Sequence, residues 1–168
     1  RSIVHHVEGK MMTGDTIYYD KRIGFGEVLG EMVMSDSTQK ITLTGEYGQM
    51  WEEDSRGYAT DSALMIDWSD TAHIAYIHAD TLFTEELHYT DSALMDSTYR
   101  RARAYFGVRV FRDDMQMTCD SMVYIGADST MHLYTDPICW SENQQIAADS
   151  ITVYIVNGTV DHAIGEGN

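Results

Sequence analysis

Apolar and polar residues alternate with a period of two along most of this chain, and this pattern predicts β-strands. The alternation is clear over residues 104–110 and continues over 115–119 and 122–125. The run 151–156 is the clearest strand, and the Asn-Gly pair that follows it favours a tight hairpin turn. No amphipathic helix of useful length accompanies these runs. The pattern therefore predicts an all-β fold with no substantial helix.

A short phrase recurs between the apolar runs: Asp, then Ser or Thr, then alternating apolar residues. Asp and Ser side chains hydrogen-bond their own backbone and favour corners, whereas the residues that follow favour a pleated strand. The copies begin, at irregular spacing, at Asp15, Asp61, Asp80, Asp91, Asp120 and Asp149. A corner followed by a strand, repeated along one chain, predicts an imperfect β-repeat with stacked rungs.

The other apolar runs extend the β prediction to both halves of the chain. Further strands are predicted at 16–19, 23–25, 28–34, 41–44, 57–65, 72–77, 81–84, 131–134, 138–140 and 159–162. The stretch 84–99 is rich in Thr, Asp, Glu and Ser and favours a loop or a short helical turn. We expect one domain, 1–168, divisible into half-repeats of about 1–84 and 100–164 that an insertion at 85–99 joins.

The net charge of the chain disfavours some classes of partner, and its apolar runs and first residue bear on membrane insertion and processing. The chain has 27 acidic and 11 basic residues and a net charge of −16, which disfavours nucleic acid and simple adhesion to anionic lipid surfaces. No apolar run approaches the roughly 18 residues that span a bilayer, and no signal peptide is present. Because the first residue is Arg rather than Met, we expect a processed or excised segment.

Basic residues and cysteines each allow two interpretations. Five arginines cluster at Arg100, Arg101, Arg103, Arg109 and Arg112. A solvated strand face balanced by nearby acids is the favoured interpretation, and a small anion-contacting patch is the alternative. Cys119 and Cys139 are either buried thiols, which we favour slightly, or a disulfide.

Catalytic and metal-binding patterns are absent from the sequence. The seven histidines show no metal-ligand spacing, although the His5-His6 pair could bind nickel or zinc adventitiously. There is no calcium-hand loop, nucleophile elbow, P-loop or dinucleotide fingerprint. Ser and Asp abound only in the corner phrase, where the backbone uses them. We therefore expect no enzyme activity, no cofactor and no metal.

Methionine is unusually frequent, with 11 residues against four phenylalanines. Met is flexible and polarisable, and it suits both irregular cores and surfaces that adapt to apolar partners. One side of successive strands is predicted to carry Phe106, Val108, Met115, Met117, Met122, Met131, Leu133, Trp140, Ile151 and Val153. If this apolar trough closes on itself it is a core, and if it stays open it is a groove for acyl chains or another apolar ligand.

The segment 104–162 resembles the OstA/LptA family of periplasmic lipopolysaccharide-transport proteins. The resemblance rests on an ordered series of degenerate motifs at 104–111, 114–124, 128–134, 136–140, 145–154 and 157–161. The same pattern recurs at 14–19 and 28–33 and loosens through the middle of the chain. The resemblance is strong for the last 60 residues and moderate before them.

This resemblance implies an OstA-like twisted β-jellyroll, a V-shaped stack of antiparallel strands, whose interior holds the acyl chains of lipid A. The groove residues that it implies are Phe106, Val108, Val110, Met117, Met122, Tyr124, Leu133, Trp140, Ile151 and Val153. Candidate phosphate contacts are Arg101, Arg103 and Arg109. It further implies the periplasm of a Gram-negative bacterium, and partner domains that stack through edge strands into a bridge toward the outer membrane.

Three functions remain in competition at this stage. The first is a non-catalytic lipid conduit, and the second is an envelope scaffold of the same fold with a dry core. The third is a β-helical enzyme that acts on polysaccharide through paired carboxylates. The third is disfavoured, because such enzymes are usually longer and turn chemistry already explains the Asp residues.

Overall fold

A computed structural model describes residues 2–5, 9–90, 92–93 and 95–167 of the chain. All regular structure in the described residues is β, which confirms the predicted fold class. No described helix is long and apolar enough to cross a membrane. The strands are β1 (Ser2–His5), β2 (Lys10–Gly14), β3 (Thr16–Asp20), β4 (Phe25–Asp36), β5 (Ile41–Trp51), β6 (Arg56–Asp67), β7 (Ala75–Thr90), β8 (Asp96–Phe111), β9 (Gln116–Ile125), β10 (Thr130–Tyr134), β11 (Ile138–Ser141), β12 (Gln144–Ala147), β13 (Ser150–Val156) and β14 (Thr159–Glu166).

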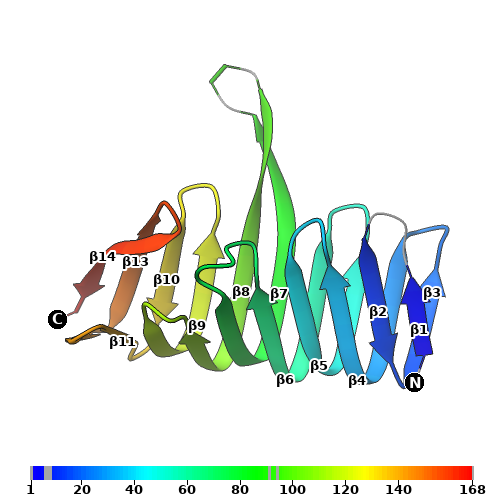
Figure 1. Ribbon diagram of the computed structural model, residues 1–168, viewed down its shortest axis with the longest axis horizontal. Helices are drawn as coiled ribbons and strands as arrows, with labels where there is room; N and C mark the ends of the chain where they lie inside the picture. Colours follow the sequence, from blue (N-terminus) through cyan, green and yellow to red (C-terminus); the bar gives the residue numbers. More distant parts are fainter. Residues whose placement is uncertain (1, 6–8, 91, 94, 168) are drawn as a thin grey trace.

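The strands form one antiparallel sheet that runs the length of the molecule from N-terminus to C-terminus (Figure 1). The main order is β1-β2-β4-β5-β6-β7-β8-β9-β10-β13-β14. Off this path, β3 pairs with β4, β11 pairs with β9 and β12, and β12 pairs with β11. Neighbours along the chain are therefore mostly neighbours in the sheet, as short hairpin connections require.

Each long strand bends near its middle, at a bulge that shifts its register with the next strand. In β8 and β9, Tyr105 pairs with Ser121 but Val108 pairs with Cys119, so two residues oppose one. Similar shifts interrupt the pairs β4–β5, β5–β6, β6–β7 and β7–β8. Such bulges bend a strand and increase its twist. The sheet therefore folds over along a line of corners, as the curled strands in Figure 1 show.

The Asp-Ser/Thr phrase lies at these corners where the structure describes it. Asp61 and Ser62 both have left-handed backbone with φ of 62° and 59°. In the bulge between β6 and β7, these two residues lie opposite Asp80, because Thr60 pairs with Thr81 and Ala63 with Ala79. Asp is among the few residues that tolerate this conformation. Asp91, which begins another copy, lies outside the described residues.

The line of corners divides the sheet into two walls. We call wall A the strands β1, β2, β11 and β12 with the halves of β4–β9 that meet at turns 36–41, 67–75 and 111–116. Wall B contains β3, β10, β13 and β14 with the other halves, which meet at turns 51–56 and 125–130 and in the long β7–β8 hairpin. The inner faces of the walls share one hydrophobic cluster that extends from β2 to β13.

The β7–β8 hairpin extends beyond wall B as a two-stranded ribbon, which rises above the rest of the molecule in Figure 1. Its pairing continues without a shift from Thr81–Tyr105 to Thr90–Asp96. The prediction of a loop or short helical turn at 84–99 was therefore wrong, because cross-strand pairing organises residues that have little apolar pattern of their own. We call residues 87–99 the arm.

Candidate functional site

Most of the predicted trough residues lie together between the two walls. Each of the following has at most 2% of its surface exposed: Val108, Val110, Met117, Met122, Leu133, Ile151 and Val153. Tyr124 packs against them and is partly buried. Met115 and Met131, also predicted for the trough, belong to the same cluster. The period of two in strands 104–110, 115–119 and 151–156 therefore located this interior face correctly.

Phe106 is the first exception, and its predicted place in the trough was wrong. Phe106 is 63% exposed and so lies outside the buried interior. Phe106 and Gly107 form the bulge in β8 with φ of 67° and 63°, so both leave the regular alternation. Ala104 and Val108 on either side remain buried. The prediction assumed a continuous period of two across 104–110 and therefore assigned Phe106, at the corner, to the wrong face.

Trp140 is the second exception, since its indole lies on the outer face. In β11 it is Cys139 that is buried and pairs directly with Met117 of β9. Neighbouring residues of a strand point to opposite faces, so Trp140 points outward. Its indole Nε1–H donates to Oε1 of Gln145 in β12 at 3.1 Å. A short run with apolar residues at every position, 138–140, carries no period from which a face can be assigned.

The free ends of the two walls face each other along the side opposite the corners, which we call the mouth. Polar contacts hold the walls together at intervals along it. At the N-terminal end, the Lys10 ammonium of wall A donates to Oγ of Ser55 in wall B at 3.3 Å. Lys10 also lies 3.9 Å from the Asp36 carboxylate of its own wall. This contact joins β2 to the β5–β6 turn.

The middle contact centres on Gln39, in the β4–β5 turn of wall A. Its Nε2 donates to Oε2 of Glu86 at 2.6 Å, and its Oε1 accepts from the Arg100 guanidinium. Glu86 and Arg100 are cross-strand partners at the base of the arm. Burial lowers the pKa of Arg100, while the nearby carboxylates of Asp67 and Asp36 act in the opposite direction. The Gln39 side chain of wall A therefore forms hydrogen bonds with both β7 and β8 of wall B.

The C-terminal contact is made by Arg112, whose side chain is 7% exposed. Its guanidinium donates to both carboxylate oxygens of Asp114, at 2.9 and 3.0 Å, and to the backbone oxygen of Gly158 at 2.6 Å. The backbone N–H of Val160 donates to Asp114 at 3.4 Å. A bidentate Arg–carboxylate pair has fixed geometry. Through its hydrogen bonds with Gly158 and Val160, this pair joins the β8–β9 turn of wall A to the β13–β14 hairpin.

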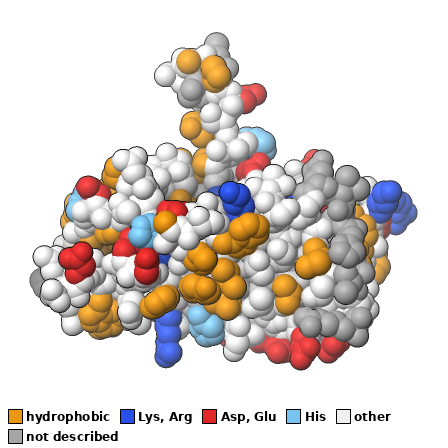
Figure 2. Space-filling model, in the orientation of Figure 1, with side chains coloured by type: hydrophobic (Ala, Val, Ile, Leu, Met, Phe, Trp, Pro, Cys, Tyr) orange, Lys and Arg blue, Asp and Glu red, His pale blue; other side chains and the backbone are white. Residues whose placement is uncertain are grey.

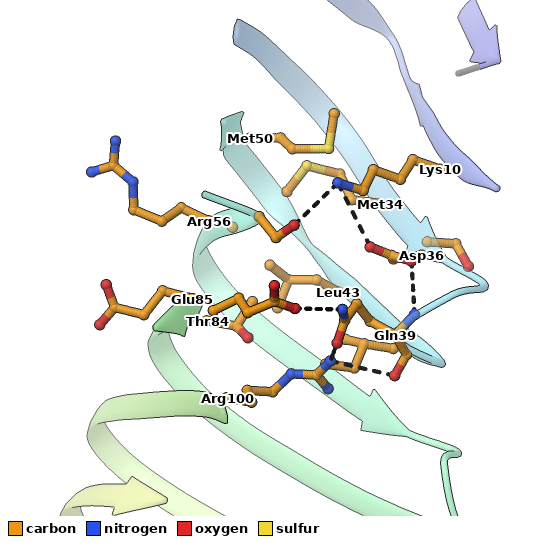
Figure 3. Close-up of a pocket in the computed structure, with 15 residues that line it drawn as sticks. Lys10, Met34, Asp36, Gln39, Leu43, Met50, Arg56, Thr84, Glu85 and Arg100 are labelled. Atoms are coloured by element: carbon orange, nitrogen blue, oxygen red, sulfur yellow. Dashed lines mark hydrogen bonds and ion pairs between the residues drawn. The ribbon is translucent and has the colours of Figure 1, made fainter. Parts of the chain in front are cut away.

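Two openings lie between these contacts. The first, shown in Figure 3, lies between the N-terminal and middle contacts and has a volume of about 60 Å³. Its apolar lining comes from both walls and comprises Met34, Ile41, Leu43 and Met50. In Figure 3 the polar ends of Arg56 and Glu85 point away from these residues. The opening therefore leads from a polar rim to an apolar floor.

The second opening lies between the middle and C-terminal contacts and has a volume of about 190 Å³. Its apolar lining comprises Met65, Ala75, Ile77, Met131 and Ile155. Polar side chains at its rim include Asp67, Asp70, His73, Arg100 and Arg112. Both openings are smaller than the roughly 300 Å³ of a typical ligand pocket, so a larger ligand requires the walls to separate.

The three arginines proposed as phosphate contacts lie outside this interior. Arg101 donates to Oε1 of Glu85 at 2.7 Å on the outer face of wall B. Arg103 lies over the ring of Phe83, 5.1 Å from its centroid. Arg109 is exposed between buried Val108 and Val110. The mouth instead uses Arg100 and Arg112, because the alternation of β8 and the turn after it place these two side chains toward the opposite wall.

The two cysteines face the interior as free thiols. Burial raises the pKa of Cys119 to about 12 and also raises that of Cys139. Cys139 pairs with Met117, so Cys119 is its diagonal neighbour across β9 and β11. Diagonal neighbours in a sheet are about 7–8 Å apart, beyond the usual reach of a disulfide. Both thiols are therefore unreactive parts of the core.

One group of side chains of the kind that bind metal ions lies close together in the structure but was not predicted from the sequence. His73, Asp113 and Asp114 place one candidate ligand atom each within 4.8 Å of the others. They come from turns 40 residues apart, so no local spacing could reveal them. Nδ1 of His73 lies 2.6 Å from Asp113, but Asp114 is held by Arg112. The group is accounted for as an ion-pair network, and His6 and the side chain of His5 lie outside the described part of the chain.

Strand edges with no neighbouring strand among the described residues lie at both ends of the sheet. β1 and β3 are the last strands of walls A and B at the N-terminal end, and β12 and β14 are the last at the C-terminal end. Tyr18 on β3 is 56% exposed, and Ile164 on β14 is 45% exposed. Free edges of this kind are able to pair with strands of another chain.

Comparisons with known proteins agree with this geometry at the level of the fold. No protein-family model matches the sequence, and no curated protein matches it. A solved structure does match: LptH from Pseudomonas aeruginosa, described as the LptA-homologous periplasmic component of its lipopolysaccharide transport device. The TM-score is 0.55 at 10% sequence identity, over 74% of this chain and 81% of LptH. The two chains share a fold. The expected LptA-like jellyroll is therefore confirmed as a fold, and function needs separate argument.

Proposed function

We propose that this chain is a periplasmic lipid-carrying module that holds acyl chains between its two walls and admits them through the mouth. The observation that carries the proposal is the single apolar interior, which extends from β2 to β13 and is approached through two openings with apolar floors. The fold shared with LptH, whose description places it in lipopolysaccharide transport, makes lipid A the first ligand to test. The proposed role needs no covalent chemistry.

The interior is closed in this structure, so the energy of opening must be compared with the gain on binding. Burying about ten methylene groups of an acyl chain is worth about 8 kcal/mol, at about 0.8 kcal/mol per group. Three polar contacts span the mouth, each worth about 1–3 kcal/mol where charge is involved. An acyl chain also replaces the packing that the walls lose, and flexible methionines such as Met117 and Met122 adapt to it. A ligand with two or more long chains therefore gains more free energy on burial than the loss of these contacts costs.

We further propose that partner domains of the same fold add to the edge strands at the two ends. Addition of β1 or β3 of one domain to β12 or β14 of the next would continue both walls and the apolar interior between them. A stack of this kind gives a lipid a continuous path along the molecules. Copies of this chain and membrane-bound proteins with the same fold are the candidate partners.

An envelope scaffold with a dry core is the second candidate. Its support is the extent of burial, since Met12, Val28, Met122, Leu133 and Val153 are all 0% exposed. A core packed to this degree needs no ligand for stability. In this case the same edge strands would serve assembly alone.

Native mass spectrometry with photo-crosslinking separates these functions. The purified chain is mixed with lipid A, or with phosphatidylethanolamine, each carrying a diazirine on one acyl chain, and is irradiated. Lipid transport predicts a bound-lipid mass and crosslinks in interior peptides that contain Met117, Met122 or Val153. Crosslinks confined to outer-face peptides such as that of Trp140, or no bound lipid at all, would reject transport in favour of the scaffold.

A further inference from the structure

Ion pairs among the described residues all lie within one wall or the other, and none of them joins the two walls across the mouth. In wall A the pairs are Lys10–Asp36, His73–Asp113 and Arg112–Asp114. In wall B they are Arg22–Asp20, Arg56–Asp54, Arg101–Glu85, Arg103–Glu85 and His162–Asp161. Separation of the walls therefore leaves every one of these pairs in place.

The hydrogen bonds of the three mouth contacts each have one uncharged partner. At the N-terminal and C-terminal contacts these partners are the hydroxyl of Ser55 and the backbone groups of Gly158 and Val160. At the middle contact the uncharged partner is the amide of Gln39. Loss of such a bond costs less than separation of a buried ion pair, because water replaces the missing partner and no charge is left buried alone.

The middle contact differs from the other two, because its two charged side chains belong to the same wall. Glu86 and Arg100 lie directly opposite each other in β7 and β8, and both line the first opening. Side chains at such positions are close enough to form an ion pair. In this structure Gln39 is bonded to both instead: its Nε2 donates to Glu86 at 2.6 Å, and its Oε1 accepts from Arg100 (Figure 3). A neutral amide of wall A thus bridges two opposite charges of wall B.

Carboxylates of wall A also attract the Arg100 guanidinium across the mouth. Burial lowers the pKa of Arg100, and the negative charges of Asp67 and then Asp36 oppose that effect. Both carboxylates accept hydrogen bonds from backbone N–H groups of their own turns, and neither is hydrogen-bonded to the guanidinium. Their attraction favours the closed mouth and is lost as the walls separate. Glu86, in contrast, stays beside Arg100 in wall B.

The middle contact also separates the two openings of the mouth. Arg100 lines both of them, and no other described residue does so. Release of Gln39 would therefore join openings of about 60 and 190 Å³ into one slot. The floor of this slot would run from Leu43 in the first opening to Met65 in the second. The N-terminal and C-terminal contacts lie at the outer ends of the openings, so release of either would join nothing.

We propose that the mouth opens first at the middle contact, and that Glu86 and Arg100 exchange Gln39 for each other as it opens. The inference rests on the proposed function, because the open slot is the entrance for acyl chains. Gln39 leaves with wall A, where the carboxylate of Asp36 accepts from its backbone N–H at 2.9 Å. The ion pair that then forms within wall B offsets part of the lost hydrogen bonding. The end contacts gain no new pair, since theirs are already formed.

The first test exchanges the amide and the carboxylate between the two walls. Gln39→Glu combined with Glu86→Gln keeps the net charge and supplies an acceptor for Arg100 and an amide donor to the new carboxylate. The ion pair of Arg100 now crosses the mouth, and its cross-strand neighbour in wall B is neutral. We expect a fluorescent acyl probe with an uncharged headgroup to bind at least tenfold more slowly than to the parent in stopped-flow mixing. Equal rates would overturn the proposal and leave lipid carriage standing.

The second variant weakens the same contact instead of strengthening it. Gln39→Met removes the bridging amide and keeps an unbranched side chain, so we expect the probe to bind at least threefold faster. Gln49→Met is the matched control, because the amide of Gln49 donates to Tyr47 within wall B at 2.7 Å. This control should bind the probe at the rate of the parent. An equal acceleration by both variants would show that the middle contact has no special role.

Distances between the walls test the opening without any lipid. Nitroxides on Thr71→Cys in wall A and Ala127→Cys in wall B, both exposed, report wall separation by double electron–electron resonance. Cys119 and Cys139 are buried and stay unlabelled. We expect Gln39→Met to increase the population of long distances, and the exchange variant to decrease it. Identical distributions would reject opening at this contact. Failure of the proposed function looks different, since the probe would then bind to none of the variants, whatever the distances.

Discussion

Strands β7 and β8 include two unlike regions beyond their bulges, the part within wall B and the arm. Within the wall, Leu82, Ala102 and Ala104 lie under the opposite wall and are at most 2% exposed. Along the arm the same pairing continues, but Tyr89 is 42% and Met95 64% exposed. Cross-strand hydrogen bonds are thus alike in both regions, whereas burial is not. Burial by wall A is what distinguishes a stable element from a marginal ribbon.

A second contrast exists between the two faces of the sheet. The inner faces share one cluster, while the outer faces carry smaller aromatic groups such as Tyr76 and Phe111, with ring centroids 6.3 Å apart. Figure 2 shows hydrophobic side chains gathered below the arm on the face in view. Tyr76 and Phe111 are 39% and 50% exposed, so they contribute far less to stability than interior residues of equal size.

The largest effect is expected for a cavity in the interior of the walls. Leu133→Ala removes a side chain that is 0% exposed in β10, so we expect a loss of about 2–5 kcal/mol in the free energy of unfolding. Chemical denaturation followed by far-UV circular dichroism measures it. A loss below about 1 kcal/mol would mean that the interior is loosely packed and that the contrast with the arm is overstated.

A smaller loss is expected at the mouth. Arg112→Met breaks the buried pair with Asp114 and the bond to Gly158, and we expect a loss of about 2–3 kcal/mol. Arg109→Met on the outer face is the control and should stay within about 0.5 kcal/mol. If both variants have the same stability, the C-terminal contact does not hold the walls together.

Removal of the arm should have little effect on the free energy of unfolding. Replacing residues 87–99 by an Asn-Gly turn leaves the Glu86–Arg100 pair and the contacts of Gln39 in place. We expect a change of less than about 1 kcal/mol, because an isolated two-stranded ribbon is marginal by itself. Differential scanning calorimetry of the parent and the shortened chain tests it. A large drop in melting temperature would show that the arm supports the body.

The smallest effect concerns pH and the ion pair of His73. The hydrogen bond to Asp113 raises the pKa of His73 and lowers that of Asp113. The His73 contribution to stability is therefore full below its unfolded pKa of about 6.5 and is lost as pH rises through the raised folded value. The Asp113 contribution is full above 3.8 and is lost as pH falls through the lowered folded value. Asp113→Asn should return the pKa of His73 toward 6.5 in an NMR titration, and an unchanged pKa would contradict the pairing.

Sequence reasoning succeeded where a residue's role depends on its immediate neighbours. Alternation placed Val108, Met117 and Val153 on the inner face, and the Asp-Ser phrase located a corner at Asp61. It failed at Phe106, where a bulge interrupts the period, and at Trp140, where every residue of a short run is apolar. It also missed the arm, because polar residues adopt strand geometry there through pairing with a partner strand.

The sequence by itself therefore determined the fold class, the corners and most of the interior, since a period of two and turn chemistry are local properties. Only the tertiary structure decided what forms the mouth. Gln39 lies 47 positions from Glu86 and 61 positions from Arg100 along the chain. The folding of one wall over the other brings these residues together. Whether a charge is paired depends on that long-range approach. Of the five clustered arginines, Arg101, Arg103 and Arg109 consequently lie outside, whereas Arg100 and Arg112 make contacts across the mouth that only the tertiary structure reveals.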